Sequence, residues 1–232
     1  MDYFQSKFDK KEVGKMFNNI APMYDFLNRF FSLGIDLYWR KKLAKAIERK
    51  SHFDYLDIAC GTGDQIIAVY KEHRTSLRKV VGVDIAIEML ALAKKKLPKH
   101  VQLIEENALQ LPFKDNSFDV ISISFGIRNM PDLSLCLKEM RRVLKPDGKL
   151  CILEFSIPQN RLVKTLHLFY LRKILPGLGA VVSNDSTAYR YLNETIEEFP
   201  YGESFCSILK KNGFNKPECK PLTFGIASLY VS

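Results

Sequence analysis

A glycine-rich turn between an apolar segment and a helical one constrains this chain most strongly. Residues Leu56–Asp64 read LDIACGTGD, which predicts a buried strand, a sharp turn and the start of a helix. The apolar segment Val80–Asp84 predicts a second buried strand that carries a carboxylate at its end. A strand, turn, helix and acidic strand end together form the nucleotide pocket of a Rossmann-like α/β fold. The alternative is an ordinary βαβ turn that binds no ligand.

The residues of the turn narrow the class of cofactor. A dinucleotide fingerprint has a third glycine three residues after Gly63, and Ile66 stands there instead. Asp64 puts a negative charge at the start of the helix, where a pyrophosphate needs amides and a positive field. Both features disfavour NAD and FAD and fit a ligand with an amino group, such as S-adenosylmethionine. Asp84 follows the turn at roughly the 20-residue spacing of an acid that binds ribose hydroxyls.

Composition predicts one folded domain. The chain has 232 residues and 47% hydrophobic content, enough for one substantial core. No stretch of about 18 apolar residues suggests a membrane span, and the N-terminus lacks the pattern of a secretory signal. Five cysteines without paired spacing predict a reduced, cytoplasmic protein, and four scattered histidines predict no metal site.

Strand and helix patterns alternate through the middle of the chain. Continuous apolar strands separated by helices predict a mostly parallel sheet that is covered on both faces. The expected strands are Tyr55–Cys60, Lys79–Asp84, Val101–Glu105, Phe118–Ser124 and Lys149–Phe155, and the expected helices are Asp64–Glu72, Ile87–Leu97 and Leu133–Leu144, the last closed by a turn at Lys145–Gly148.

Four regions of a single domain follow from this alternation. Residues 51–157 form the cofactor-binding core, between a helical N-terminal cap at 1–50 and a helical insertion at 158–212. Residues 213–232 predict a terminal antiparallel hairpin, with strands at Phe214–Cys219 and Thr223–Val231. Open α/β sheets bind ligands at the carboxyl ends of their strands, so the cap and the insertion are expected to form a lid there. The alternative is extra core with no role in binding substrate.

Motifs along almost the whole chain resemble one family of methyltransferases. The glycine turn is common to many methyltransferases, whereas SFGIRN and the ND–YRYL segment are far narrower and carry most of the resemblance. The matching stretches are MFNNIAPMYDFLN at 16–28, DIACGTGD at 57–64, NALQLPF at 107–113, SFGIRN at 124–129, RVLKPDG at 142–148, LEFS at 153–156, and ND and YRYL at 184–192. On these residues the chain resembles the quinone-biosynthesis C-methyltransferases, class I enzymes that use S-adenosylmethionine on demethylmenaquinone or on the ubiquinone precursor.

The resemblance implies which residues contact the cofactor. A carboxylate suits the two ribose hydroxyls, an amide suits the adenine edge, and small groups suit the crowded sulfonium. Two of these residues have simpler alternatives, Asn107 as the start of a turn and Ser124 as a hydroxyl satisfied within the protein. The residues expected at the cofactor are Gly61, Thr62 and Gly63 in the turn, Asp84 at the ribose, Asn107 and Ala108 at the adenine, and Ser124 near the sulfonium.

The resemblance also implies a simple catalytic apparatus. The protein must align the reacting atoms and exclude water, and a base or water-activating group should lie near the hydroxyl of a reduced quinone. Arg128 is the first candidate, because a guanidinium cannot act as a base but can stabilise a phenolate or polarise a water. Its alternative is a structural ion pair that shapes the loop. Its expected partners are Tyr24, Asn129, Asp185 and Tyr189.

A prenylated quinol substrate would explain the leucine-rich segment Leu162–Leu178. Its apolar residues recur at helical spacing among arginines and lysines. The segment is expected to line a channel for the isoprenoid tail and to rest on the anionic inner face of a membrane, with purely internal packing as the alternative. Demethylmenaquinol is the preferred substrate over the benzoquinol precursor of ubiquinone. The oligomeric state stays open, a homodimer included.

Two other functions are weighed against this one. The formal net charge of +9 is compatible with a nucleic-acid methyltransferase as well as with solvated helix faces. Enzymes that methylate exocyclic amino groups usually carry an Asn/Asp-Pro-Pro-aromatic motif, whereas residues 124–126 read SFG and the sequence has no proline pair. Nucleic acid is therefore not an expected partner. A cofactor-binding protein without catalysis is disfavoured by the intact turn, acid and Asn-Ala pair.

Overall fold

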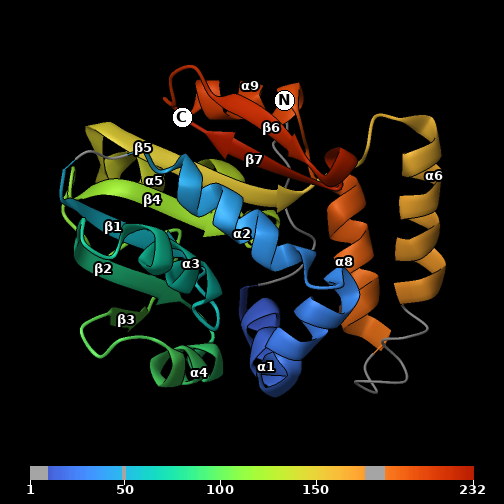
Figure 1. Ribbon diagram of the computed structural model, residues 1–232, viewed down its shortest axis with the longest axis horizontal. Coiled ribbons are helices and arrows are strands. Elements are labelled where there is room, and N and C mark those ends of the chain that lie inside the picture. Colours follow the sequence, from blue (N-terminus) through green and yellow to red (C-terminus); the bar gives the residue numbers. More distant parts are fainter. Residues whose placement is uncertain (1–9, 49–50, 176–185) are drawn as a thin grey trace.

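A seven-stranded sheet forms the centre of the fold (Figure 1). The computed structural model describes residues 10–48, 51–175 and 186–232, of which 10–13 and 186–191 are described by their backbone alone. The strand order is β3-β2-β1-β4-β5-β7-β6; β1 to β5 are parallel, and β7 pairs antiparallel with both β5 and β6. The strands are β1 Phe53–Ile58, β2 Leu77–Asp84, β3 Gln102–Glu105, β4 Phe118–Ser124, β5 Leu144–Phe155, β6 Glu218–Leu222 and β7 Ala227–Val231.

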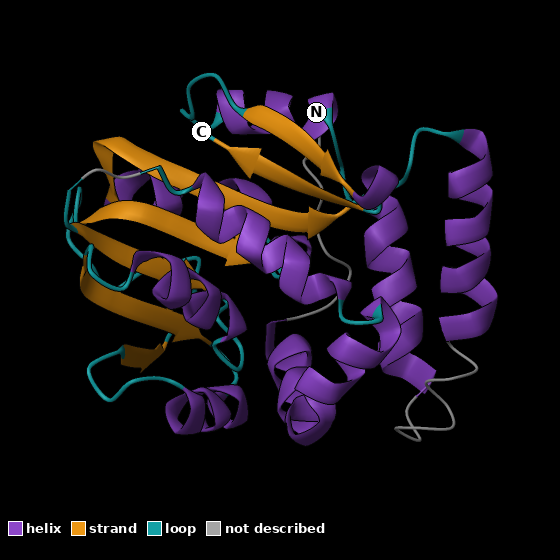
Figure 2. Cartoon of the chain, viewed as in Figure 1, coloured by secondary structure: helices purple, strands orange, loops and turns teal. Residues whose placement is uncertain are grey.

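Helices cover both faces of the sheet, as the apolar strands require (Figure 2). Alternate residues of β1 point to opposite faces of the sheet: Leu56 and Ile58 pack in the hydrophobic cluster on one face, and Tyr55 packs in the cluster on the other. The first cluster includes α5 (Leu133–Val143) and α9 (Glu203–Lys211), and the second includes α2 (Ile35–Ala46), α3 (Asp64–His73) and α4 (Ile87–Lys96). The predicted α/β class and mostly parallel sheet are confirmed.

A second group of helices stands at the carboxyl ends of the strands, on the right of Figure 1. It consists of α1 (Lys10–Ser32), α6 (Arg161–Phe169), the π-helical turn Tyr170–Ile174 that continues α6, and α8 (Ser186–Glu198). The side chain of Asn160 caps α6 by accepting hydrogen bonds from two backbone N–H groups. Ile157, Leu171, Leu175 and Ile196 form the small core of this group. No helix in the described part of the chain is both long and apolar enough to cross a membrane.

The structure corrects three details of the predicted elements. Strand β6 begins at Glu218, because Phe214 instead closes the end of α9, its N–H bonding to Leu209 O and its ring lying in the core. Residues 145–148 form no turn after a helix but a bulge inside β5, where the register jumps from Leu144 to Lys149. Helix α9 lies in the range expected for the lid, yet its buried face packs against the sheet.

Candidate active site

Two neighbouring cavities lie at the carboxyl ends of the parallel strands. The smaller one is bounded by the ends of β1, β2 and β4, by the segment after β3 and by α1. Five of the seven residues expected at the cofactor line it, together with two of the expected catalytic residues. They are Gly61, Asp84, Asn107, Ala108 and Ser124, with Tyr24 and Asn129. The predicted meeting of the glycine turn and the acidic strand end is thus present in the structure.

Asp84 fixes the glycine turn and presents a carboxylate to the smaller cavity. Its Oδ2 accepts a hydrogen bond from the Gly61 N–H at 2.7 Å, and its Oδ1 accepts one from the Ala86 N–H at 2.9 Å. Burial raises the pKa of Asp84, and these backbone N–H groups partly offset that rise. Each carboxylate oxygen can accept a second hydrogen bond, so the group is suited to a pair of hydroxyls.

The two glycines of the turn have different tasks. Gly61 has φ +53°, and a Cβ built on it would approach no atom beyond its chain neighbours closer than Tyr24 Cε1 at 4.0 Å, so that space belongs to the cavity. Gly63 has φ +83°, and a Cβ there would lie 2.7 Å from Leu97 Cδ1. Gly63 therefore permits close packing under the turn and does not line the cavity. Both residues adopt a left-handed backbone conformation that glycine takes without strain, and at Gly63 the missing Cβ also leaves room for Leu97.

Thr62 also lies outside the lining of the cavity. It is buried, and its hydroxyl donates to Asp25 Oδ1 at 2.5 Å and accepts from Lys96 Nζ at 3.1 Å. Lys96 in turn donates to Asp25 and to Asp64, at 2.6 Å each, and Arg29 donates to Asp64. These contacts fasten α1 across the glycine turn.

Asp64 is the acidic centre of this network. Burial by itself would raise the pKa of the Asp64 carboxyl, but the hydrogen bond from Lys96 and the charge of Arg40 outweigh it and lower the pKa. The charge that the sequence analysis placed at the start of α3 is therefore neutralised within the protein. The sequence of α1 did not predict these contacts, because the residues that Asp25 and Arg29 bind lie in the glycine turn, at the start of α3 and in α4.

Asn107 and Ser124 each make the hydrogen bond expected of a purely structural residue and also line the smaller cavity. Asn107 Oδ1 accepts a hydrogen bond from the Leu109 N–H at 3.1 Å, which is the turn-starting role. Ser124 Oγ donates to Gln65 Oε1 at 3.1 Å, which satisfies it within the protein. Both residues nevertheless line the smaller cavity, so their protein contacts orient them there.

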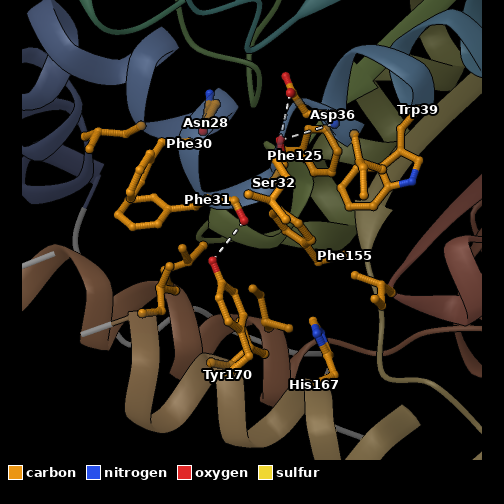
Figure 3. A pocket seen from close by; sticks show the side chains of 18 of the residues that line it. Asn28, Phe30, Phe31, Ser32, Asp36, Trp39, Phe125, Phe155, His167 and Tyr170 are labelled. Carbon is orange, nitrogen blue, oxygen red and sulfur yellow. Dashed lines mark hydrogen bonds between the residues drawn. The ribbon is translucent and has the colours of Figure 1, made fainter. Parts of the chain in front are cut away.

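The larger cavity has a volume of about 600 Å³ and lies among α1, α2, α6 and α8. Figure 3 shows that aromatic side chains from several elements converge on it. A cavity of this size, mostly apolar with a few polar groups, is the usual form of a small-molecule site. Among the aromatic lining residues are Phe30, Phe31, Trp39, Phe155 and Tyr170.

The two cavities share part of their walls. Phe17, Tyr24 and Phe125 line both of them. Phe17 and Tyr24 meet edge to face with ring centroids 6.1 Å apart, and both come from α1. A ligand in the smaller cavity and a second ligand in the larger one would therefore meet at these three rings.

Arg128 forms a buried ion pair and also borders the larger cavity. Its Nη1 donates to Glu154 Oε1 at 2.7 Å and to Phe125 O at 2.6 Å. Burial raises the pKa of Glu154, and the charge of Arg128 offsets part of this rise. The structural alternative for Arg128 is thus present. Its Nε–H, which is also buried, has no hydrogen-bond partner among the described residues.

The other expected catalytic residues lie in different places. Tyr24 stands at the boundary of the two cavities, and Asn129 lines the smaller one. Asp185 lies outside the described residues, and only the backbone of Tyr189 is described, within α8. His167, which lines the larger cavity from α6, was not among the residues predicted from the sequence. The signal was available, because His167 lies on the same face of the helix as Val163 and Leu171.

Comparison with known proteins decides the family. The model of the ubiE/COQ5 methyltransferase family matches residues 5–232. The chain belongs to this family. It is 43% identical to the demethylmenaquinone methyltransferase of Chlorobaculum tepidum, over 96% of this chain and 92% of that one. It is 42% identical to the ubiquinone/menaquinone biosynthesis C-methyltransferase UbiE of Geotalea uraniireducens, over 95% of each chain.

Solved structures confirm the fold. A SAM-dependent methyltransferase of Thermotoga maritima matches with a TM-score of 0.65 at 16% identity, over 93% of this chain and 98% of that one. A SAM-dependent methyltransferase of Aquifex aeolicus matches with a TM-score of 0.59 at 18% identity, over 97% and 98%. These likenesses confirm the class I methyltransferase fold. Family membership confirms the predicted enzyme class, a methyltransferase with S-adenosylmethionine as methyl donor.

Proposed function

We propose that the enzyme methylates a ring carbon of a reduced prenylated quinone, converting demethylmenaquinol to menaquinol. The observation that carries this proposal is the pair of cavities, one at the glycine turn with several polar groups in its lining and one large and apolar, which share Phe17, Tyr24 and Phe125. The polar groups in the lining of the first suit a nucleoside, and the apolar walls of the second suit an oily ring with its tail. The name of the Chlorobaculum tepidum relative supports this substrate.

The smaller cavity is the proposed site of S-adenosylmethionine, and its residues fit that group. The Asp84 carboxylate suits the ribose hydroxyls, Asn107 and Ala108 suit the adenine edge, and the space beside Gly61 is kept open by the missing Cβ. Ser124 and Asn129 line the same cavity, as does Phe125, which also lines the larger one. When bound there, the cofactor supplies an electrophilic methyl group.

The residues of the larger cavity act on the quinol. The aromatic walls exclude water, which strengthens every electrostatic contact inside the cavity. In this proposal the guanidinium of Arg128, whose Nε–H is unpartnered, stabilises negative charge on a ring oxygen, which makes the neighbouring carbon more nucleophilic. The ion pair with Glu154 holds the guanidinium in its position.

The benzoquinol precursor of ubiquinone is the second candidate substrate, because the Geotalea uraniireducens relative is named for both pathways. The test gives purified protein, in separate reactions, reduced demethylmenaquinone and that benzoquinol with methyl-labelled S-adenosylmethionine. We expect label in the naphthoquinol product, and the Asp84→Ala variant serves as the inactive control. Label in neither quinol, or label in transfer RNA instead, would refute the proposal.

We also propose that α6 rests on the anionic inner face of a membrane, as a peripheral contact of a cytoplasmic protein. Leu162, Leu166 and Phe169 are 70%, 61% and 57% exposed, and Leu166 also lines the larger cavity. An apolar helix face at the cavity edge would let a lipid-soluble quinol pass from the bilayer. The exposed basic residues around it, which suit anionic lipid, are Arg161, Lys164, Arg172 and Lys173.

Vesicle flotation tests this contact. The protein should float with vesicles that contain phosphatidylglycerol and float less with phosphatidylcholine alone. The Leu162→Ser/Phe169→Ser variant should stay behind, and its fold should be unchanged because both side chains are exposed. Wild-type protein that stays in the soluble fraction with anionic vesicles would contradict the contact.

A further inference from the structure

His167 is a buried polar side chain in the apolar wall of the larger cavity. It is 8% exposed, and its Nε2 has no hydrogen-bond partner within the described residues. Figure 3 shows the ring projecting from α6 toward the side of the cavity where Phe155, Phe125 and Trp39 gather. Leaving such a nitrogen unpaired costs about 1–3 kcal/mol, so a ligand with a hydroxyl group would supply the missing partner.

Two other titratable groups that line the larger cavity, Asp36 and Tyr170, already have hydrogen-bond partners within the protein. Asp36 accepts hydrogen bonds from Arg29 and from Ser32 Oγ, the latter at 2.8 Å. The Tyr170 hydroxyl donates to Phe31 O at 2.9 Å, and burial raises the pKa of Tyr170. A paired carboxylate and a protonated phenol are poor proton acceptors.

The charged groups around His167 leave it neutral. Burial lowers the pKa of the imidazole, and the Glu197 carboxylate on α8 raises it by less. Glu197 is itself paired with Arg172, whose Nε donates to it at 2.8 Å. The cations Arg128 and Arg40 line other walls of the same cavity, and Arg40 lies beside Asp36, whose carboxylate is already paired. A neutral imidazole carries a lone pair that can accept a proton.

We propose that His167 is a catalytic residue that accepts the proton of a quinol ring hydroxyl through Nε2. This deepens the proposed function and rests on it. The O–H bond breaks, its electron pair stays on the oxygen as a phenolate, and the proton bonds to the lone pair of Nε2. Arg128 stabilises the oxygen, and the imidazolium later releases the proton to solvent. The division of labour follows from the residue types, since Arg128 cannot take a proton and His167 can.

The test compares His167→Gln and His167→Ala with a matched control, His52→Gln. His52 is exposed and directly precedes β1, at the amino end of the sheet. We expect kcat with reduced demethylmenaquinone to fall by about 10²–10⁴-fold in both His167 variants and to stay unchanged in the control. Added imidazole should restore part of the activity of His167→Ala, since the deletion leaves room for it. A purely structural role would not respond to imidazole.

Two further readouts separate this proposal from the proposed function. In wild-type protein, kcat should rise with pH along an acidic limb with a midpoint below 6.5, and this limb should vanish in His167→Gln. The ¹⁵N resonances of the four histidines should show one imidazole, absent from the His167 variants, that titrates at the same midpoint. If wild-type protein methylates the quinol and the kcat of His167→Gln is within threefold of the wild-type value, the proposal for His167 is overturned and the proposed function stays intact.

Discussion

Replacing Arg128 by methionine should destabilise the protein as well as slow it, because the change leaves Glu154 buried and unpaired. The Arg128 side chain is 6% exposed and that of Glu154 is 0% exposed, with Nη1 and Oε1 2.7 Å apart. Removing one partner of such a buried pair costs about 3–5 kcal/mol. For a chain of this size that corresponds to a melting temperature lower by about 6–20 °C.

The loss of stability in Arg128→Met should depend on pH, because the protonation of Glu154 depends on it. Burial raises the pKa of Glu154 and Arg128 offsets part of that rise, so the variant has a still higher folded-state pKa. A carboxyl whose pKa is raised on folding binds more protons when folded, so this contribution to stability falls as pH rises from about 4 through the folded-state pKa. The difference between wild type and Arg128→Met should therefore be smaller at pH 5.5 than at pH 8.

The double variant Arg128→Met/Glu154→Gln separates the two roles of the arginine. It removes both charges, and the glutamine oxygen can still accept the Phe155 N–H that Glu154 holds at 2.9 Å. Urea unfolding should place its stability within about 1.5 kcal/mol of wild type. Its turnover should stay about 10²–10³-fold low, because the group that stabilises the ring oxygen is still missing.

Two results would refute this reasoning. Equal stability of Arg128→Met and wild type at pH 8 would mean that the ion pair does not hold the loop. Recovery of turnover in the double variant would mean that Arg128 acts only through its pair with Glu154. Affinity for S-adenosylmethionine, measured by calorimetry, should be nearly unchanged in both variants, since neither residue lines the smaller cavity.

Three further changes test the cofactor site and the core beneath it. Asp84→Ala should weaken S-adenosylmethionine binding by at least about tenfold in calorimetry, since it removes charged hydrogen-bond acceptors, and unchanged affinity would rule out the assigned site. Gly61→Val should abolish binding because its side chain would enter the cavity at φ +53°, and a variant that still bound tightly would show that the nucleoside lies elsewhere. Burial raises the pKa of Asp57 to about 7, so wild-type stability should fall between about pH 4 and pH 7 relative to Asp57→Asn, by up to about 4 kcal/mol; parallel urea-unfolding curves of the two proteins would contradict this.

The sheet and the cofactor cavity were predictable because their signals are local. Each apolar segment forms its own strand. The glycine turn at Gly61 follows β1, Asp84 ends β2, and these two strands are parallel neighbours in the sheet. Their contact is therefore a consequence of the alternation of strands and helices. Family motifs added Asn107, Ala108 and Ser124, which the structure brings to the same cavity.

The parts that sequence could not supply depend on partners far along the chain. Thr62 sits in the glycine turn, yet its hydroxyl is engaged by Asp25 of α1 and Lys96 of α4. Periodicity predicted that the segment Leu162–Leu178 is helical and lines a channel, but it did not single out His167, because only the structure shows that its buried Nε2 has no partner among the described residues. Arg128 had two alternatives, and only the structure shows that one guanidinium pairs with Glu154 and still keeps a free Nε–H.

A crystal structure with S-adenosylhomocysteine and a menaquinol analogue tests the two-cavity assignment most directly. We expect the nucleoside in the smaller cavity with its ribose at Asp84, and the quinol ring in the larger cavity, the two ligands meeting beside Phe17, Tyr24 and Phe125. A nucleoside among the aromatic residues of the larger cavity, or a quinol bound outside it, would contradict the assignment.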